Sequence, residues 1–262
     1  MKNFNRKKIQ QRCLKYRLRI LELSQKVSAL HLGGSFSSTE ILDVLFNIVM
    51  NKSEKNNFIL SKGHSSILQY VILEDLKVLK KKDVENYCQK KGFLGVHPDR
   101  ETPGINASTG SLGHGLGMAC GIALAVKKKN QRVFCVISDG ELQEGSTWEA
   151  FIAATSINIK NLIVIIDNNN LQSLEQTSNS HPYLYPIEEK FKCLGWQSIK
   201  CNGHDSLAIL RAIKNKKKNK PLVIVAKTIK GYPISFMSNN PIWHYRSPNQ
   251  KELNIALKEL NE

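Results

Sequence analysis

The sequence between residues 133 and 226 alternates short apolar runs, rich in β-branched residues, with segments of helical length. The apolar runs span 133–137, 162–166, 197–199 and 222–226. The helix-length segments between them span 145–156, 186–194 and 204–218. Buried strands that alternate with helices form parallel sheets with helices packed on both faces. The sequence therefore predicts an α/β fold with a parallel sheet and helices on both faces.

The remainder of the chain shows mainly helical periodicity. Helices are expected over 5–30, 38–51, 64–79, 81–90, 118–128 and 249–260. Ser37, with Glu40 three residues later, has the pattern of a capping box that opens the second of these helices. No internal repeat or long linker interrupts the pattern, so we expect residues 1–262 to form one domain.

The composition argues against several classes of protein. The longest apolar runs, such as 162–166, are far too short to cross a bilayer. The N-terminal residues contain no apolar stretch followed by a small-residue cleavage site, so we expect no secretory signal. The six cysteines form no CxxC pair and show no zinc-binding spacing, which is typical of a reducing compartment. We therefore expect a cytoplasmic protein with no membrane contact.

The net charge of +16 raises the question of an anionic partner. Much of the excess lies in the N-terminal segment and in 214–220, without the interleaved aromatic residues of a single-strand-binding surface. We therefore expect solvated basic faces and no nucleic acid. A mitochondrial presequence is the rival interpretation of residues 1–20. Against it, apolar residues continue at helical spacing into the domain, which favours a structural helix: Ile9, Cys13, Ile20, Leu23 and Val27.

Polar, turn-forming residues follow two of the predicted strands. Ser138, Asp139 and Gly140 come after the first, and 167–170 follow the second. Ligands of open α/β sheets bind beyond the carboxyl ends of the strands. Asp139 and Asn169 offer the oxygen ligands that Mg²⁺ or Ca²⁺ prefers, and a glycine lets the backbone approach a phosphate. The pattern indicates a metal and diphosphate site, although Asp-Gly and Asn-Asn also occur in simple turns.

These segments resemble a known motif. SDGELQEGSTWEA followed by IVIIDNNNLQ is similar to the thiamine-diphosphate motif, Gly-Asp-Gly and then Asn about thirty residues later. Further segments resemble, in family order, the N-terminal half of transketolase: SKGHSS (61–66), GVHPDRETPGINASTGSLGHGLGMACG (95–121), AKTIKGYPISFM (226–237) and NNPIWH (239–244). In length the chain is most similar to the split bacterial type, in which that half is a separate subunit. The resemblance implies the thiamine-diphosphate-binding fold of the diphosphate-binding type.

The resemblance also implies roles for individual residues. Asp139 and Asn169 would bind the divalent metal through their side chains, and Leu171 through its carbonyl. The other cofactor-binding residues would be Gly140 at the diphosphate, Gly110 and Leu112 at the rings, His64, and Glu144 near the interface between two cofactor sites. The histidines of the substrate channel, with catalytic roles, would be His31, His64, His97 and His244. His114, His181 and His204 are expected to be structural or neutral.

The implied reaction is transfer of a two-carbon ketol group between sugars, usually phosphorylated. The chain lacks the pyrimidine-binding half that completes such a site, so the resemblance implies a C-terminal partner subunit, most plausibly in an α2β2 heterotetramer. The resemblance also implies that the small-residue face 113–125 packs in the region of the interface with this partner. The alternatives are a subunit of a 2-oxo acid dehydrogenase, a fragment similar to deoxyxylulose-phosphate synthase, or a non-catalytic regulatory subunit.

Several positions depart from the family pattern. Ser138 replaces a glycine, and three further stretches differ: Ser173-Leu174-Glu175, Gly231-Tyr232-Pro233 and Tyr245-Arg246-Ser247-Pro248. We expect these three stretches to cluster near the substrate entrance and to accompany an altered sugar substrate.

Overall fold

A five-stranded parallel sheet forms the centre of the computed structural model, which describes residues 4–27, 29–50, 56–129, 131–173 and 175–261. The strand order is β1-β2-β3-β5-β4, and every neighbouring pair is parallel. The strands are β1 (Asn57–Leu60), β2 (Val133–Ser138), β3 (Leu162–Asn168), β4 (Gln197–Asn202) and β5 (Leu222–Lys227). The predicted fold class is confirmed.

Strand β1 is the one strand of this sheet that the sequence did not predict. Its four residues follow a polar segment, and an apolar run as short as Phe58–Leu60 shows no measurable period. Parallel pairing with β2 stabilises it, with Phe58 opposite Phe134 and Leu60 opposite Val136. The strand therefore depends on pairing with β2, which cannot be predicted from its own four residues.

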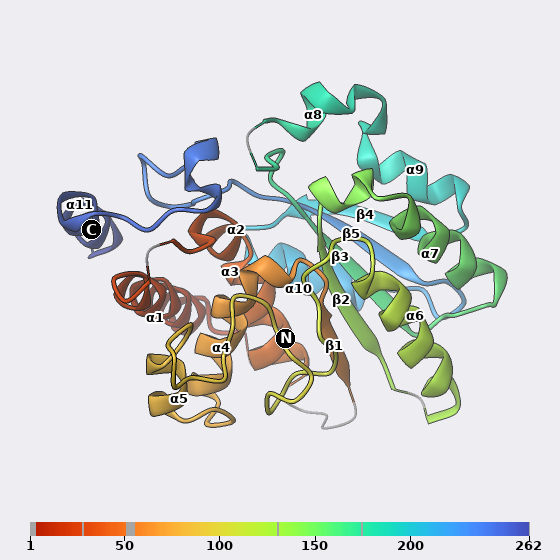
Figure 1. Ribbon diagram of the computed structural model, residues 1–262. Helices are drawn as coiled ribbons and strands as arrows, with labels where there is room; N and C mark the ends of the chain where they lie inside the picture. Colours follow the sequence, from red (N-terminus) through yellow and green to blue (C-terminus); the bar gives the residue numbers. More distant parts are fainter. Residues whose placement is uncertain (1–3, 28, 51–55, 130, 174, 262) are drawn as a thin grey trace.

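Helices cover both faces of the sheet (Figure 1). One face packs against α1 (Arg6–Ser24), α3 (Thr39–Asp43), α4 (Ser66–Asp75) and α10 (Ser206–Lys214). The opposite face packs against α6 (Gly115–Ala125), α7 (Gly145–Ser156) and α9 (Ile187–Cys193). Side chains alternate along each strand, so Phe134 and Val136 belong to the first core and Cys135 and Ile137 to the second. Both faces are buried, which explains the continuous apolar runs in the sequence.

The long helix expected over 38–51 is wrong in its bounds. The described chain instead forms α2 (Leu32–Ser37), α3 and a π-helical turn over Val44–Val49, while residue 51 lies outside the described ranges. The capping box is also wrong, because Ser37 ends α2 and its hydroxyl donates to Asp167 at 2.6 Å. Glu40 forms an ion pair with Arg17. A buried tertiary contact has replaced the local cap that the spacing suggested.

The other expected helices are present; those expected over 5–30, 64–79 and 81–90 are shorter, whereas 118–128 and 249–260 keep their length with shifted bounds. Helix α1 ends at Ser24, before the expected end at residue 30, and Ser28 lies outside the described residues. The remaining elements are α5 (Lys81–Glu85), α8 (Thr177–Ser180), α11 (Gln250–Asn261) and the short turns η2 (Gly63–Ser65), η3 (Lys127–Lys129), η4 (Gly140–Gln143), η5 (Pro182–Leu184) and η6 (Pro241–His244). In the described ranges, no helix has the length and apolar content needed to cross a membrane.

The N-terminal basic segment is a packed helix. Ile9, Cys13 and Ile20 on α1 are each at most 3% exposed. Arg12 and Arg19 on the same helix form ion pairs with Asp43 and Glu74. Part of the positive charge near this end of the chain is therefore neutralised inside the fold.

Candidate active site

A cleft lies beyond the carboxyl ends of the strands and gathers the residues that the motifs predicted. Its volume is about 320 Å³. All of the predicted site residues except Asp139 line it: His31, His64, His97, Gly110, Leu112, Gly140, Glu144, Asn169, Leu171 and His244. Asp139 is 1% exposed and lies beneath the lining, directly after β2. Segments up to 213 residues apart in the sequence, His31 and His244, therefore meet at one edge of the sheet.

Asp139 is wrapped by the loop that follows β3. Its Oδ1 accepts the N–H of Gly140 at 3.0 Å, and its Oδ2 accepts the N–H of Asn170 at 2.5 Å. The side chain of Asn169 accepts the N–H of Leu171 at 3.0 Å. Burial raises the pKa of Asp139 to about 7, and repulsion from Asp167 adds to this effect. A buried carboxylate without a cationic partner is an unfavourable arrangement that a bound cation would relieve.

Asp167 and Lys62 form a second buried charge centre next to the first. Both side chains are fully buried and form an ion pair. Asp167 also accepts hydrogen bonds from Ser38 at 2.8 Å and from Thr228. Burial alone would raise the pKa of Asp167, but Lys62 and the surrounding donors hold it below its ordinary value. This pair connects β3 to the segment that follows β1.

Lys230 is a site residue that the sequence analysis did not assign. It is 2% exposed, and its Nζ lies 3.0 Å from the carbonyl oxygens of Leu171 and Gln172 and 2.8 Å from Nδ1 of His244. A Cβ on Gly33 would lie 2.9 Å from Cγ of Lys230, so glycine is needed where the lysine passes. Burial lowers the pKa of Lys230 to about 8, and Lys62 contributes. Like Lys62, it stands inside a motif segment, which was the available signal.

The four channel histidines form one cluster. The ring centroids of His31 lie 5.3 Å from His64, 6.4 Å from His97 and 5.2 Å from His244. His64 and His244 are 5.7 Å apart. Among the described residues, Nδ1 of His31 is buried with no hydrogen-bond partner. The cluster therefore presents imidazole groups to a common space and leaves one ring nitrogen for a ligand.

These histidines are neutral near physiological pH. Burial lowers the pKa of His31 to about 4 and that of His244 to about 3, with neighbouring cations adding to the effect. Burial also lowers the pKa values of His64 and His97. When Lys230 is protonated it donates to Nδ1 of His244, which places the proton of the neutral imidazole on Nε2. The cluster can thus donate and accept hydrogen bonds without carrying charge.

The remaining predicted residues lie at the rim of the cleft. Gly110 faces His97, and a Cβ at this position would lie 2.9 Å from Cγ of that ring. Leu112 is half-buried in the same loop. Glu144 is exposed and occupies the N-cap position of α7. Gly140 begins η4 directly after Asp139, and a Cβ at this position would lie 3.5 Å from Cβ of Gln172. Leu112 and Glu144 therefore keep accessible surface at the mouth of the cleft.

The departures from the family pattern are only partly gathered at this cleft. Ser173 lines it, whereas Leu174 lies outside the described residues. The Tyr245 ring lies 4.5 Å from the ring of His31. Tyr232 does not line the cleft; its ring lies 4.0 Å from His204 on the other side of the segment that carries Lys230. The expectation that all three stretches cluster at the substrate entrance is therefore wrong for Tyr232.

Comparison with known proteins identifies the family. The model of the transketolase thiamine diphosphate-binding domain matches residues 9–257. The chain belongs to the transketolase family. It is 34% identical to a subunit of the apulose-4-phosphate transketolase of Actinobacillus succinogenes, over 88% of each chain. It is 30% identical to the protein of the same name from Phocaeicola vulgatus, over 95% of this chain and 92% of that protein.

Full-length transketolases share the same fold over part of their length. The structure of Campylobacter jejuni transketolase superposes with a TM-score of 0.89 at 26% identity. That match covers 98% of this chain and 43% of the other. The chain thus spans about two fifths of a full-length transketolase, whereas it matches almost the whole of the apulose-4-phosphate transketolase subunits. It is a transketolase-type subunit that carries the thiamine diphosphate-binding domain.

The residues of the cleft fit a divalent metal and a diphosphate. The oxygen donors are the Asp139 carboxylate, the Asn169 amide and the Leu171 carbonyl, which is the donor set of a hard cation. The Leu171 carbonyl already accepts a hydrogen bond from a cationic group, the ammonium of Lys230. Lys230 brings a cationic side chain to the same cleft, whereas the charge of Lys62 is neutralised by Asp167. The site therefore has both the oxygens for a metal and the positive charge for an anion.

Proposed function

We propose that this chain is the diphosphate-binding subunit of a two-subunit transketolase that transfers a two-carbon ketol group between sugar phosphates. The observation that supports this most strongly is the cleft itself. It combines hard oxygen donors and buried lysines on one side with four neutral histidines on the other. We also propose that residues 1–262 act as one domain and that the protein works in the cytoplasm, where its six free cysteines stay reduced.

In this proposal the side of the cleft that carries Asn169, Leu171 and Lys230 holds the cofactor. Asp139, Asn169 and the Leu171 carbonyl would bind Mg²⁺ or Ca²⁺. Gly140 and Lys230 would contact the diphosphate, the first through its N–H and the second through its ammonium group. Thiamine diphosphate, when bound, supplies the reactive carbon that breaks and forms the carbon–carbon bond. The protein supplies binding, orientation and proton transfer.

The histidines would act on the sugar. His31, His64 and His97 are neutral and open to the cleft, so each can accept a proton from a hydroxyl or donate to an oxyanion. The unpaired Nδ1 of His31 is a further contact for a sugar hydroxyl. Nε2–H of His244 is a donor whose direction is held by Lys230 at Nδ1. The cluster thus matches a substrate with several hydroxyl groups.

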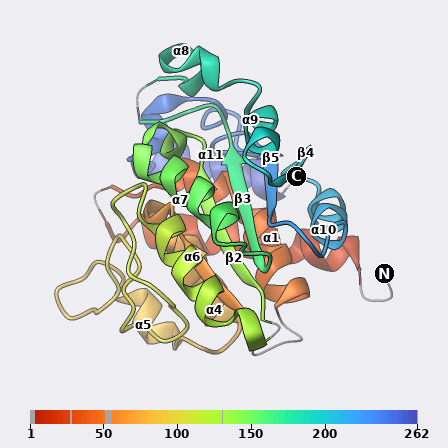
Figure 2. The same cartoon turned by 90° about the vertical axis from the view of Figure 1, so that its right-hand side faces the viewer.

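A second polypeptide would complete the site. Helices α6 and α7 lie toward the viewer in Figure 2. Apolar side chains are exposed on these helices and at the C-cap of α7: Met118, Leu124, Ile152 and Ile157. A Cβ at Gly117 or Gly121 would meet nothing within 4 Å, so this face of α6 is open to close packing. Large exposed apolar surface is typical of an interface. We propose that the partner is a pyrimidine-binding subunit, that Glu144 lies beside its interface, and that the assembly is α2β2.

The sugar is a specialised one in this proposal. Two relatives matched over nearly their whole length are named as subunits of an apulose-4-phosphate transketolase. We therefore propose a ketose phosphate of the apulose 4-phosphate type as donor. Turnover with xylulose 5-phosphate and ribose 5-phosphate that equals or exceeds turnover with apulose 4-phosphate would refute this assignment.

The first experiment is calorimetric titration of thiamine diphosphate with Mg²⁺ into this chain, alone and mixed with a pyrimidine-binding subunit. We expect tight binding only in the mixture. The matched variant is Gly117→Leu, which should leave the folded chain stable but weaken binding in the mixture by blocking assembly. Full ketol transfer by the chain alone would contradict the need for a partner.

A further inference from the structure

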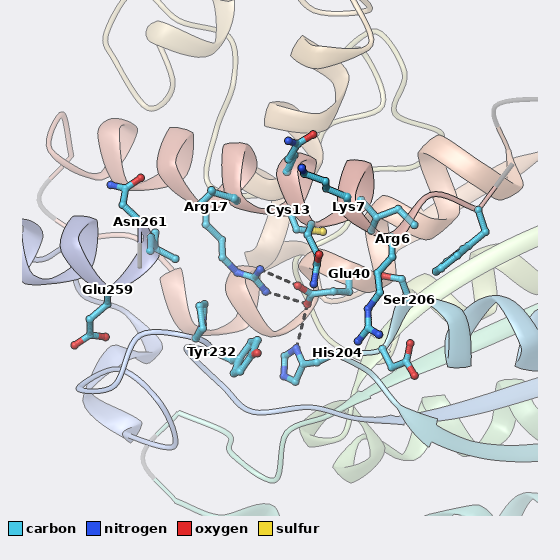
Figure 3. A pocket seen from close by; sticks show the side chains of 18 residues that line it. Arg6, Lys7, Cys13, Arg17, Glu40, His204, Ser206, Tyr232, Glu259 and Asn261 are labelled. Atoms are coloured by element: carbon cyan, nitrogen blue, oxygen red, sulfur yellow. Dashed lines mark hydrogen bonds and ion pairs between the residues drawn. The ribbon is translucent and has the colours of Figure 1, made fainter.

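A second polar cluster lies behind the cleft, on the opposite side of the segment 228–231. It joins Arg17 on α1, Glu40 on α3 and His204 in the turn after β4, beside a cavity of about 610 Å³. Figure 3 shows the two side chains converging on Glu40, with Tyr232 next to the His204 ring. Arg17 and Glu40 are 4% and 7% exposed. These charges are therefore buried among partners and contribute nothing to a solvated surface.

The hydrogen bonds of the cluster fix the tautomer of His204. Its Nε2 lies 2.9 Å from the backbone N–H of Ile229, so Nε2 must be the unprotonated acceptor. The proton is then on Nδ1, which donates to Oε2 of Glu40 at 3.0 Å. Glu40 is held in turn by Arg17, with contacts of 2.7 and 2.9 Å. The imidazole is thus locked between a carboxylate and a backbone amide.

The amide that His204 accepts belongs to the segment that supplies Lys230. In this extended stretch, Thr228 donates to Asp167 and Lys230 reaches the carbonyls of Leu171 and Gln172. The N–H of Ile229 points the other way, to His204. The segment is therefore held on one side by the side chains of Thr228 and Lys230, and on the other side by the bond between its Ile229 N–H and His204.

The same cluster also reaches the helix that follows His31. Nη2 of Arg17 donates to the carbonyl of Phe36 at 3.1 Å, within α2. His31 is the N-cap residue of that helix. One buried network thus contacts two of the backbone segments that carry cleft residues, α2 and the stretch after β5.

We propose that His204 is a positioning residue for the cofactor side of the cleft. Held by Glu40, it fixes the amide of Ile229 and thereby holds the ammonium of Lys230 against Leu171 and His244. The placement of Lys230 is independent of the proposed function; only its consequence for cofactor affinity rests on that function. His204 does not line the cleft, so it acts through Lys230.

Two substitutions separate the two bonds of the imidazole. His204→Asn places an amide near the position of Nδ1, where it can donate to Glu40, but leaves the N–H of Ile229 without an acceptor. His204→Gln places a carbonyl near the position of Nε2, where it can accept from Ile229, but loses the bond to Glu40. His181→Asn, at an exposed histidine, is the matched control. The positioning role predicts that the Gln variant resembles the wild type and the Asn variant does not.

The readout is the rate at which acetic anhydride modifies Lys230 in the cofactor-free full chain, followed by peptide mass spectrometry. Lys62, which is also fully buried, is the internal reference. We expect the Lys230-to-Lys62 ratio of rates to rise about fivefold in His204→Asn, the factor for one lost hydrogen bond. The ratio should stay at the wild-type value in His204→Gln and His181→Asn. Hydrogen exchange of the wild-type Ile229 amide should also be slow, although this residue lies outside the strands.

Two results would overturn the proposal: an unchanged ratio in His204→Asn, or fast exchange of the wild-type Ile229 amide. An unchanged ratio in which both rates rise would mean that His204 only stabilises the fold. Thiamine diphosphate and Mg²⁺ are then titrated into the complex of each variant with its partner subunit. A changed ratio with unchanged cofactor affinity would support the positioning of Lys230 and contradict its proposed contact with the diphosphate.

Discussion

Two aspartates, Asp139 and Asp167, lie at the ends of neighbouring strands, and they differ in the partners that surround their carboxylates. Asp167, at the end of β3, is surrounded by donors from three other segments, one of which supplies its ion-pair partner Lys62. Among the residues that the structure describes, Asp139, directly after β2, receives two backbone N–H groups and one weak contact from Thr177 at 3.3 Å. One carboxylate is neutralised by a buried ion pair, whereas the other forms no ion pair with a described residue.

The pKa values record the same difference. The pKa of Asp167 is held below its ordinary value despite complete burial, whereas burial raises that of Asp139 to about 7. The comparison therefore separates a charge that maintains the structure from a charge that is kept for binding. It also shows that burial alone does not identify a functional carboxylate.

The largest expected effect is on stability, from Asp167→Asn. This substitution leaves the Lys62 ammonium buried without its counter-ion, which typically costs about 3–5 kcal/mol. The free energy of unfolding, measured by urea denaturation of the full chain, should fall by that amount. The control is the double variant Lys62→Met with Asp167→Asn, which removes both charges and should recover much of the loss. A single variant as stable as the wild type would show that the pair carries no structural weight.

The next effect is on binding, from Asp139→Asn. The variant loses the charged ligand of the proposed metal site, and losing a buried charged partner costs about 3 kcal/mol, or roughly 100-fold in affinity. Calorimetric titration of thiamine diphosphate with Mg²⁺ in the assembled complex measures this. In the metal-free chain the same substitution removes a buried charge and should not destabilise the fold. Unchanged cofactor affinity would refute the metal assignment.

The sequence alone predicted a functional role for one of the two aspartates, Asp139. Asp139 was identified because it follows a predicted strand and precedes a glycine, and the same pattern indicated Asn169. Asp167 was assigned no role, because its partners Ser38, Lys62 and Thr228 come from distant segments. A local pattern carries the chemistry of a strand end, but it cannot show which charges the fold has already paired.

The same limit explains the other differences. The fold class followed from alternating runs that need no tertiary knowledge. Strand β1 was missed, since its four residues depend on pairing with β2. Ser37 and Glu40 had the spacing of a capping box, yet each is used in a long-range contact, with Asp167 and Arg17. Lys230 was quoted within a motif, but only the structure places its ammonium beside His244.

The third effect is a pH dependence with opposite signs for the two aspartates. The pKa of Asp139 is higher in the folded chain than the model-compound value of 3.8, so its contribution to stability is present below that pH and is lost as the pH rises toward about 7. Each pKa unit of difference corresponds to about 1.4 kcal/mol. Asp167 has a lowered pKa, so its contribution is lost as the pH falls below 3.8.

Urea unfolding of the metal-free chain between pH 4 and 8, with EDTA present, measures the first contribution by comparing the wild type with Asp139→Asn. The variant should gain stability relative to the wild type as the pH rises through this range. Saturating Mg²⁺ and thiamine diphosphate, added to the complex, should reverse the order of stability at pH 8. A difference between the two proteins that does not change with pH would contradict the raised pKa.

The smallest effect distinguishes the hydroxyl groups that contact each aspartate. Thr228→Val removes a donor to Asp167 and should cost about 2 kcal/mol of unfolding free energy, because hydrogen bonds to charged groups are among the stronger ones. Thr177→Val removes the 3.3 Å contact to Asp139, together with the bonds of the same hydroxyl to Asn170 and Tyr185. This substitution should cost about 1 kcal/mol or less. Equal losses in the metal-free chain would mean that Asp139 is as firmly held as Asp167. Deleting the hydroxyl of Thr228, directly after β5, and that of Thr177, at the start of α8, thus tests whether the difference between the aspartates lies in their donors or only in Lys62.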